Sequence, residues 1–265
     1  MFLTTWNINI IRLRMAKRKM KTIKKKGIVI SEKNNGESDK TITILTEDAG
    51  KIYGYVRGAK KFNNKLFASS QIFSFAEFLL SESSKNKNFY SVTQIDMIEN
   101  LTPKNYIDLC YGIYFCELTN KYLLKNEPAN NILLLLIKSL KILSSNLDAQ
   151  YVSRIFEFKF MKLNGYVPET KSCHNCFALK NPMYFDEFGL VCQNCLDKSK
   201  TFCKISPPAI NLLNQLVHIK FNNLIEPAHE KSVLQELIAP SRIFINSHLD
   251  INLNSKKFIY EIESQ

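Results

Sequence analysis

The sequence predicts an α+β protein, with an N-terminal five-stranded OB-like β-barrel followed by an α-helical domain that a small four-cysteine, zinc-binding lobe interrupts. Three observations predict this fold class. Hydrophobic residues alternate with a period of two over residues 27–100, and they recur with a helical period over residues 101–265. Two Cys-x-x-Cys pairs lie within about residues 170–200, inside the helical part.

The barrel region divides into five alternating stretches, separated by turns rich in Asn, Gly, Ser and Lys. The expected strands are residues 27–33, 40–47, 50–58, 72–83 and 88–99. Five short strands can close into a small barrel, and closure removes the exposed edges that an open sheet would leave. An SH3-like barrel or an open sheet is the alternative.

N-cap residues mark the expected helices of the second domain. Thr102 is expected to cap the first helix, with Pro103 at its first position. The second helix is expected at about residues 128–144. Its run at 132–137 is apolar on every side, so this helix should lie centrally in a bundle. Asp148 is expected to cap the third helix.

The later helices are predicted from glycine and proline positions. The third helix should end just before Gly165, which can adopt the left-handed conformation of a helix stop. Ser206 followed by Pro207 opens another helix after the cysteine segment. A last helical stretch at about residues 228–249 must break or kink at Pro240, because proline lacks a backbone N–H.

The positive charge is concentrated at the N-terminus. The net charge is +12, and residues 1–26 hold nine basic residues and no acid, so the remaining chain carries 27 basic against 24 acidic residues. A basic end beside a nearly balanced body indicates an arm that contacts a polyanion. The alternative is a mis-set start, since a start at Met20 would lower the net charge to +7. Residues 1–26 are therefore expected to be a basic N-terminal extension or the product of such a start.

Four cysteines have the spacing of a zinc site. Cys173, Cys176, Cys192 and Cys195 form two Cys-x-x-Cys pairs separated by fifteen residues. Each pair supplies two thiolates from one tight turn, and four thiolates complete a tetrahedron around Zn²⁺. Because no position is left for water, we expect one structural zinc ion that stabilises a short hairpin with its turn near residues 186–189. Disulfides, a redox pair or an iron–sulfur cluster are the alternatives.

Two other interpretations of the cysteine lobe, a histidine ligand and a finger that reads DNA bases, have less support. His174 lies between two cysteines and is expected to be an exposed bystander rather than a ligand. A finger that reads DNA bases needs a basic helix beside the metal. The chain offers only Lys198, Lys200 and Lys204 before the next prolines. The lobe is therefore expected to hold structure.

The third strand and the loop after it combine cations with aromatic rings. If Ile52 and Val56 face the interior of the barrel, the alternating side chains face outward. A single-stranded nucleic acid needs cations for its phosphates and flat rings for its bases, and Phe62 adds a ring to this stretch. The predicted DNA-binding residues are Tyr53, Tyr55, Arg57, Lys60, Lys61 and Lys65. The alternative is an ordinary solvated surface.

Several function classes have no sequence support. No Gly-rich phosphate loop or dinucleotide fingerprint occurs, and the four histidines are scattered. The longest apolar run, residues 132–137, is too short to span a bilayer. An odd count of seven cysteines, four of them at metal spacing, indicates a reducing cytoplasm. The sequence thus predicts a cytoplasmic, non-enzymatic protein without a membrane partner.

Residues 26–61, KGIVISEKNNGESDKTITILTEDAGKIYGYVRGAKK, resemble the N-terminal signature of the RecO family of bacterial recombination mediators. That signature has a GIV strand, a GESD turn and a final RGA segment followed by basic residues. The resemblance continues through the cysteine pairs to HLDINLNSKKFI at residues 248–259. It covers about residues 26–260, so residues 1–19 look like an extension or a mis-set start.

The resemblance implies a function in DNA repair. It implies that the protein binds and anneals single-stranded DNA. It also implies that the protein acts with RecR to load recombinase onto DNA coated by the single-stranded-DNA-binding protein. The acidic C-terminal tail of that coating protein would need an apolar pocket beside a cation, and Lys256, Lys257 and residues 242–245 are the candidates. Because some family members lack the cysteines, the resemblance implies that zinc is not what the function depends on.

Two other function classes remain open from the sequence. One is a zinc-stabilised OB-fold adaptor that binds RNA, which a preference for RNA over the same DNA sequence would reveal. The other is a nucleic-acid-processing enzyme, which metal-dependent strand cleavage would reveal.

Overall fold

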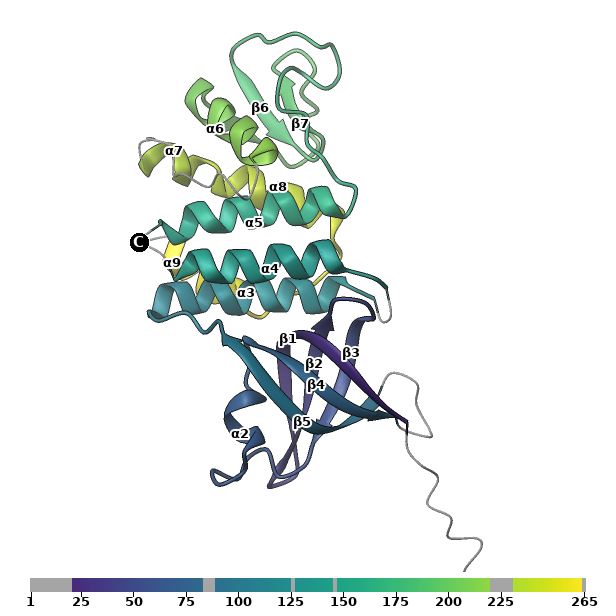
Figure 1. Ribbon diagram of the computed structural model, residues 1–265. Coiled ribbons are helices and arrows are strands. Elements are labelled where there is room, and N and C mark those ends of the chain that lie inside the picture. The colour runs from purple at the N-terminus through teal and green to yellow at the C-terminus, as the bar shows by residue number, and fades with distance from the viewer. Residues whose placement is uncertain (1–20, 83–88, 125–126, 145–146, 220–230, 264–265) are drawn as a thin grey trace, which may run out of the picture.

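The computed structural model describes residues 21–82, 89–124, 127–144, 147–219 and 231–263. The β-barrel lies at one end of the molecule and the cysteine lobe at the other, with the long helices between them (Figure 1). The predicted α+β fold class is confirmed.

The first five strands form a closed barrel in the order β1-β2-β3-β5-β4, which excludes an open sheet. They are β1 (Thr22–Asn35), β2 (Asp39–Thr46), β3 (Gly50–Val56), β4 (Ser74–Glu82) and β5 (Phe89–Asn100). Neighbouring strands are antiparallel except β3 and β5, which pair in parallel. A short helix, α2 (Leu66–Ser69), follows β3. Inward-facing aliphatic and aromatic side chains fill the barrel, among them Val29, Ile42, Ile44, Ile52 and Phe78.

Strand β1 begins at Thr22, earlier than the prediction of Gly27. The three lysines before Gly27 lie in this strand, where carboxylates elsewhere in the barrel pair with them. The ion pairs are Lys24–Glu77 (2.7 Å), Lys25–Asp48 (2.6 Å) and Lys26–Glu47 (3.2 Å). Residues 22–26 therefore belong to the barrel and not to a separate basic arm. The rest of the predicted extension, residues 1–20, lies outside the described residues.

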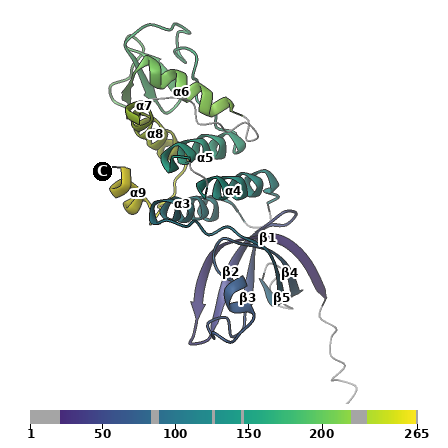
Figure 2. The same ribbon diagram turned by 60° about the vertical axis from the view of Figure 1, so that its left-hand side comes forward.

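The helical domain contains seven helices in the described part of the chain. They are α3 (Tyr106–Tyr122), α4 (Asn130–Leu143), α5 (Ala149–Leu163), α6 (Pro207–His218), α7 (Lys231–Glu236), α8 (Ile238–His248) and α9 (Lys256–Glu263). Helix α4 is largely buried, as its apolar run predicted, but Leu134 is 45% exposed. Helices α3 and α4 lie next to the barrel in both views (Figures 1 and 2).

Two of the predicted caps are confirmed and one is wrong. Asp148 accepts hydrogen bonds from the first backbone N–H groups of α5, and Ser206 accepts one from Ala209 N at 3.3 Å. Helix α3, however, starts at Tyr106, where the Asn105 side chain caps it. Thr102 donates instead to Asn100 Oδ1 at 2.6 Å, so its hydroxyl belongs to the turn after β5.

The last predicted helical stretch, at about residues 228–249, breaks before Pro240 and not at it. Helix α7 ends at Glu236 and α8 begins at Ile238, which puts Pro240 in the first turn of α8. In a first turn the missing N–H has no intrahelical acceptor, so proline is tolerated there. The segment at 228–230 lies outside the described residues.

The barrel is joined to the helices by a second hydrophobic cluster. Five side chains of the barrel domain pack in this cluster with those of the helices: Ile28, Ile30, Leu45, Phe73 and Phe75. A bulge between Val29 and Ser31 lies in this part of β1, and such a bulge redirects side chains. Gly50 has a positive φ of 62°, and a Cβ there would lie 2.0 Å from the carbonyl oxygen of Glu127. The two domains thus meet through backbone as well as side chains.

Buried charges fasten helix α9 to the bundle. Arg154 on α5 is 1% exposed, and its guanidinium lies 3.0 Å from Glu157 and 2.7 Å from Glu263 on α9. Arg242 on α8 also pairs with Glu263 at 2.5 Å. Breaking such a buried pair by removing one partner leaves an uncompensated charge, at a cost of about 3–5 kcal/mol.

Candidate metal centre and nucleic-acid interface

The four predicted metal ligands come together in the cysteine lobe. Their sulfur atoms all lie within 4.8 Å of one another. Strands β6 (Met183–Asp186) and β7 (Gly189–Cys192) form the predicted hairpin, and β8 (Cys203–Ile205) adds a third strand that the sequence did not predict. One Cys pair precedes the hairpin and the other ends it. This arrangement can hold one metal ion.

The ionisation of the sulfurs fits a cation between them. Burial opposes ionisation of Cys173, but backbone N–H groups, first that of Cys192, donate to its sulfur and lower its pKa to about 6. Neighbouring sulfurs, first Cys176 and Cys192, raise the pKa of Cys195 to about 12. Four sulfurs this close cannot all be thiolates unless a cation compensates them. A tetrahedral tetrathiolate set is the donor set of structural Zn²⁺.

His174 is a supporting residue of the lobe, not the exposed bystander that was predicted. Its Nε2 lies 3.0 Å from Asp186 Oδ2, and its side chain is largely buried. It is not one of the four clustered ligands. The imidazole therefore ties the first cysteine turn to the β6–β7 hairpin.

The lobe also packs into the helical domain. Cys173, Met183, Phe185 and Leu190 are fully buried in the same hydrophobic cluster as the long helices. The Phe185 ring meets that of Phe244 on α8 edge-on at 6.3 Å. A metal ion here would therefore stabilise the junction between lobe and helices as well as the hairpin.

The predicted DNA-binding residues lie on β3 and on the loop that follows it. Ile52, Gly54 and Val56 are buried, whereas Tyr53 and Tyr55 alternate with them and are half-buried on the outer face. Arg57, Lys61 and Lys65 are exposed, and Lys60 is half-buried. We call residues 57–65 the basic loop. The two tyrosines thus lie on β3 and the four basic residues lie on the loop directly after it, while their contact with DNA remains a prediction.

Hydrogen bonds give the basic loop a defined shape. Lys60 N donates to Ser38 O at 2.9 Å, and the Lys60 Nζ donates to Gly36 O at 3.0 Å. The Asn64 amide donates to Arg57 O at 2.9 Å. The loop is thus bound to the turn between β1 and β2 and closed on itself. The contacts of Asn64 and of Lys60 with this turn could not be predicted from the sequence, because their partners are distant along the chain.

The residues nominated for binding an acidic tail are already engaged. Arg242 pairs with Glu263 and lies 3.8 Å above the Tyr260 ring, and Lys256 donates to Asn246 Oδ1 at 2.7 Å. Lys257 is exposed, but it lies on α9 beside Lys256. Arg242 and Lys256 thus already have partners, whereas Lys257 is exposed.

A second cationic and apolar surface lies on α4 and α5. A depression of about 270 Å³ is lined by Asn131, Leu134, Leu135, Lys138, Lys159, Lys162 and Leu163. Leu134 and Leu163 are 45% and 44% exposed. Burial and the charge of Lys162 both lower the pKa of Lys159. No carboxylate lines this α4–α5 surface among the described residues, so its potential is positive. No single stretch of the sequence predicts this surface, because its lysines come from two helices.

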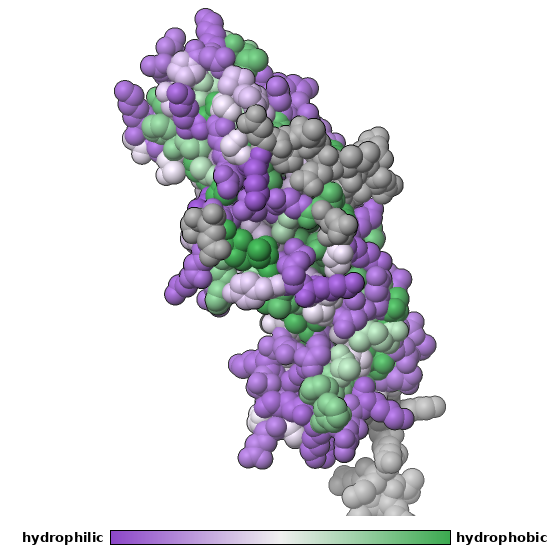
Figure 3. All heavy atoms as spheres, turned by 90° about the vertical axis from the view of Figure 1, so that its left-hand side faces the viewer, coloured by the Kyte–Doolittle hydropathy of each residue, from purple (hydrophilic) through white to green (hydrophobic). Residues whose placement is uncertain are grey.

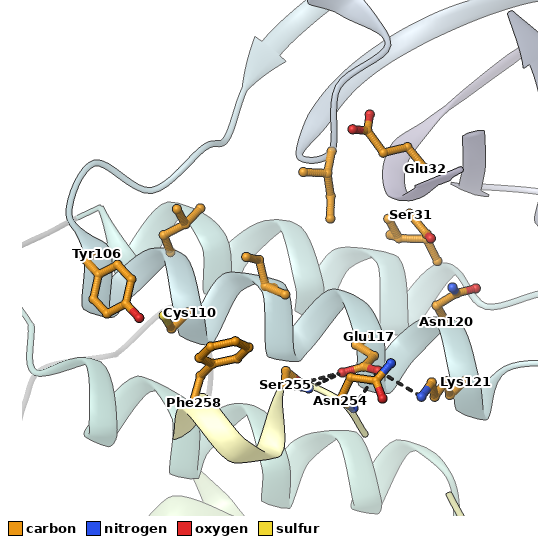
Figure 4. A pocket seen from close by; sticks show the side chains of 14 residues that line it. Ser31, Glu32, Tyr106, Cys110, Glu117, Asn120, Lys121, Asn254, Ser255 and Phe258 are labelled. Carbon is orange, nitrogen blue, oxygen red and sulfur yellow. Dashed lines mark hydrogen bonds and ion pairs between the residues drawn. The ribbon is translucent and has the colours of Figure 1, made fainter. Parts of the chain in front are cut away.

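A larger groove separates β1 from α3 and α9. It has a volume of about 580 Å³, and Tyr106 and Phe258 lie at one end of it while Glu117 and Lys121 lie at the other (Figure 4). Glu117 accepts hydrogen bonds from Asn254 N at 2.9 Å and Ser255 Oγ at 2.6 Å. Burial disfavours its ionisation, but hydrogen bonds led by that from Ser255 lower its pKa to about 2. Glu117 is therefore an anchor for α9.

These features define a class of protein: a closed OB-like barrel with a basic loop, joined to a helical domain that carries a cluster of four cysteines able to hold a metal ion. The family profile described as "Recombination protein O N terminal" matches residues 20–101, and that described as "Recombination protein O C terminal" matches residues 103–257. The chain belongs to the RecO family of DNA repair proteins.

Individual relatives agree with the family assignment. The chain is 34% identical over 250 residues to the DNA repair protein RecO of Acetivibrio thermocellus, covering 92% of this chain and 98% of that protein. It is 30% identical over 246 residues to the DNA repair protein RecO of Bacillus pumilus, covering 91% and 95%. Within the described residues, no helix is long and apolar enough to cross a membrane.

Proposed function

We propose that this protein is a non-enzymatic recombination mediator of the cytoplasm that binds and anneals single-stranded DNA. With RecR it would load recombinase onto DNA coated by the single-stranded-DNA-binding protein. The observation that carries this proposal is the basic loop, which presents cations and rings on a closed barrel. Membership of a DNA repair family supports it.

The barrel face would act through electrostatics. Arg57, Lys60, Lys61 and Lys65 neutralise phosphates along one strand, while Tyr53 adds aromatic surface. Two strands repel each other, and a cationic surface that binds both lowers this repulsion and raises their local concentration. Annealing then needs no covalent chemistry.

Cys173, Cys176, Cys192 and Cys195 would hold one structural Zn²⁺. The ion supplies folding free energy to a lobe too small to fold by its own core. Because all four ligands are protein thiolates, the site leaves no position for a reactant. We therefore assign the metal to stability and not to DNA binding.

The α4–α5 surface is our proposed site for the acidic C-terminal tail of the single-stranded-DNA-binding protein. Leu134 and Leu163 provide apolar surface, and lysines surround them. An acidic peptide with an apolar end is complementary to both features. Arg242 on α8 pairs with the carboxylate of Glu263, whereas Lys159 and Lys162 donate to the backbone carbonyls of Ile219 and Val217, which leave the positive charge of these lysines in place. We therefore favour this surface over the candidates on α8 and α9.

Replacing Leu134→Ala together with Lys162→Ala should weaken binding of a peptide with the tail sequence by roughly tenfold, since an apolar contact and a charge are lost together. Fluorescence anisotropy of the labelled peptide measures the affinity. The matched control is Lys257→Ala with Phe258→Ala, which removes an exposed cation and an exposed apolar group from α9. Equal weakening by both pairs would reject the α4–α5 assignment.

Strand annealing tests the proposed function directly. We expect the protein to speed pairing of complementary strands coated with the single-stranded-DNA-binding protein. When RecR is added, we expect it to promote loading of recombinase onto the coated strands. Fluorescence of a dye that reports duplex formation follows the reaction. No acceleration on coated DNA would contradict the proposal, and tighter binding to RNA of the same sequence would favour the RNA-binding adaptor.

A further inference from the structure

Phe62 is the most exposed of the large hydrophobic residues that the structure describes, with 86% of its surface open to solvent. It lies at the tip of the basic loop, directly after Lys60 and Lys61. Seen from the α2 side of the barrel, hydrophilic side chains surround a small hydrophobic group (Figure 3). Singly exposed hydrophobic residues are common on protein surfaces, so the position of this ring among cations, and not its exposure alone, indicates a binding role.

The ring stands on a backbone that is held in place. Lys61 N donates to Gly58 O at 3.0 Å, and Asn64 N donates to Lys61 O at 2.9 Å, so hydrogen-bonded turns flank Phe62 on both sides. Asn64 Oδ1 also accepts from Leu66 N at 2.9 Å, which joins the loop to α2. The Phe67 ring lies 6.0 Å away and supports one side of the Phe62 ring. The ring is thus presented on an ordered turn.

Asp39 fixes the start of this loop. Its carboxylate accepts a hydrogen bond from Gly58 N at 2.7 Å and another from the Tyr55 hydroxyl. The bond from Tyr55, followed by that from Gly58, lowers the pKa of Asp39, so the carboxylate stays ionised at neutral pH. Tyr55 is half-buried and its hydroxyl is engaged with Asp39. Tyr55 therefore supports the loop, and the ring of Phe62 is the more accessible of the two for contact with a base.

We propose that Phe62 stacks on an unpaired base and makes the basic loop selective for single strands, with Asp39 as the positioning residue that sets the loop. This inference rests on the proposed function, because it concerns the same barrel face. Phosphates are common to single and double strands, so the lysines alone cannot distinguish them. Only unpaired bases leave the flat face of the ring open, and an aromatic side chain held beside the cations can stack on that face. The ligand class is single-stranded nucleic acid of any sequence.

The test compares two probes, a (dT)20 oligonucleotide and a 20-residue abasic oligonucleotide that has the phosphates without the bases. We expect wild-type protein to prefer (dT)20. Phe62→Ala should lose roughly tenfold in affinity for (dT)20, within the range for loss of one stacked base, and keep its affinity for the abasic strand. Phe62→Trp should retain the preference and show fluorescence quenching by (dT)20. Phe258→Ala, which removes an exposed Phe from α9, is the matched control.

Asp39 is tested through the same readouts. Asp39→Ala should reduce both the preference for (dT)20 and the fluorescence quenching of Phe62→Trp. Asp39→Asn keeps an oxygen acceptor for Gly58 N, so this variant should retain both properties. If Phe62→Ala binds (dT)20 as tightly as wild type, the inference is overturned. A weaker binding of RecR by that variant would not rescue it, because the inference concerns contact with DNA. If wild-type protein binds neither oligonucleotide, the proposed function itself fails.

Discussion

Replacing Arg57→Ala, Lys60→Ala and Lys61→Ala together should weaken binding to single-stranded DNA by roughly tenfold to a hundredfold at about 0.1 M salt. Each cation that neutralises a phosphate releases about 0.7 of a counterion from a single strand, so removing three should also reduce the slope of log affinity against log salt by about 2. Titrations of a labelled oligonucleotide at several salt concentrations measure both quantities.

The matched control removes the same charge from the opposite end of the molecule. Lys171→Ala, Lys180→Ala and Lys198→Ala change exposed lysines of the cysteine lobe, and they should leave the affinity and the salt slope nearly unchanged. Thermal unfolding should be similar for both triple variants, because Arg57 and Lys61 are exposed and the backbone bond from Lys60 N to Ser38 O is kept in the alanine variant. Equal losses in DNA binding from the two triples would mean that net charge, and not the barrel face, drives the contact.

Replacing Cys173→Ser should reduce the zinc content from one ion per chain to none and should destabilise the protein by several kcal/mol. A serine hydroxyl is a poor ligand for Zn²⁺, and the metal supplies on the order of 10 kcal/mol to small zinc lobes. The effect should reach the helices, because the side chains of the lobe lie in their hydrophobic cluster. Elemental analysis and thermal unfolding measure the two losses.

The control for this variant is Cys203→Ala, since Cys203 lies on β8 of the same lobe but outside the cluster of four sulfurs. It should retain one zinc ion. We also expect Cys173→Ser to change DNA affinity much less than it changes stability, because the barrel has its own core. A metal content unchanged by Cys173→Ser, or a metal other than zinc in wild-type protein, would contradict the structural-zinc assignment.

Local patterns predicted the parts of the fold that depend on neighbouring residues. The alternation of Ile52, Gly54 and Val56 placed the β3 side chains on the correct faces, because side chains of a strand alternate whatever they pack against. Asp148 and Ser206 capped their helices as expected, since an N-cap bonds within its own first turn. The spacing within each Cys-x-x-Cys pair is also local, and the short β6–β7 hairpin brings the two pairs together.

Predictions failed where a distant partner decides the outcome. Lys24 was assigned to a basic arm, yet Glu77 on β4 pairs with it and β1 extends to Thr22. Thr102 has the chemistry of a cap, but Asn100 takes its hydroxyl and leaves the cap to Asn105. In each case a local signal was outweighed by a contact that exists only after folding.

The sequence by itself determined the barrel, the helical domain, the cluster of four cysteines and the family, because periodicity, spacing and signature segments are properties of the chain. The tertiary structure decided how the candidate DNA-binding face is built. Asp39 on β2 meets Tyr55 and the Gly58 N–H, and this contact sets the basic loop that presents Phe62. The tertiary structure also brought Lys138 and Lys162 together from two helices. Such surfaces depend on packing between elements, which no short stretch of sequence encodes.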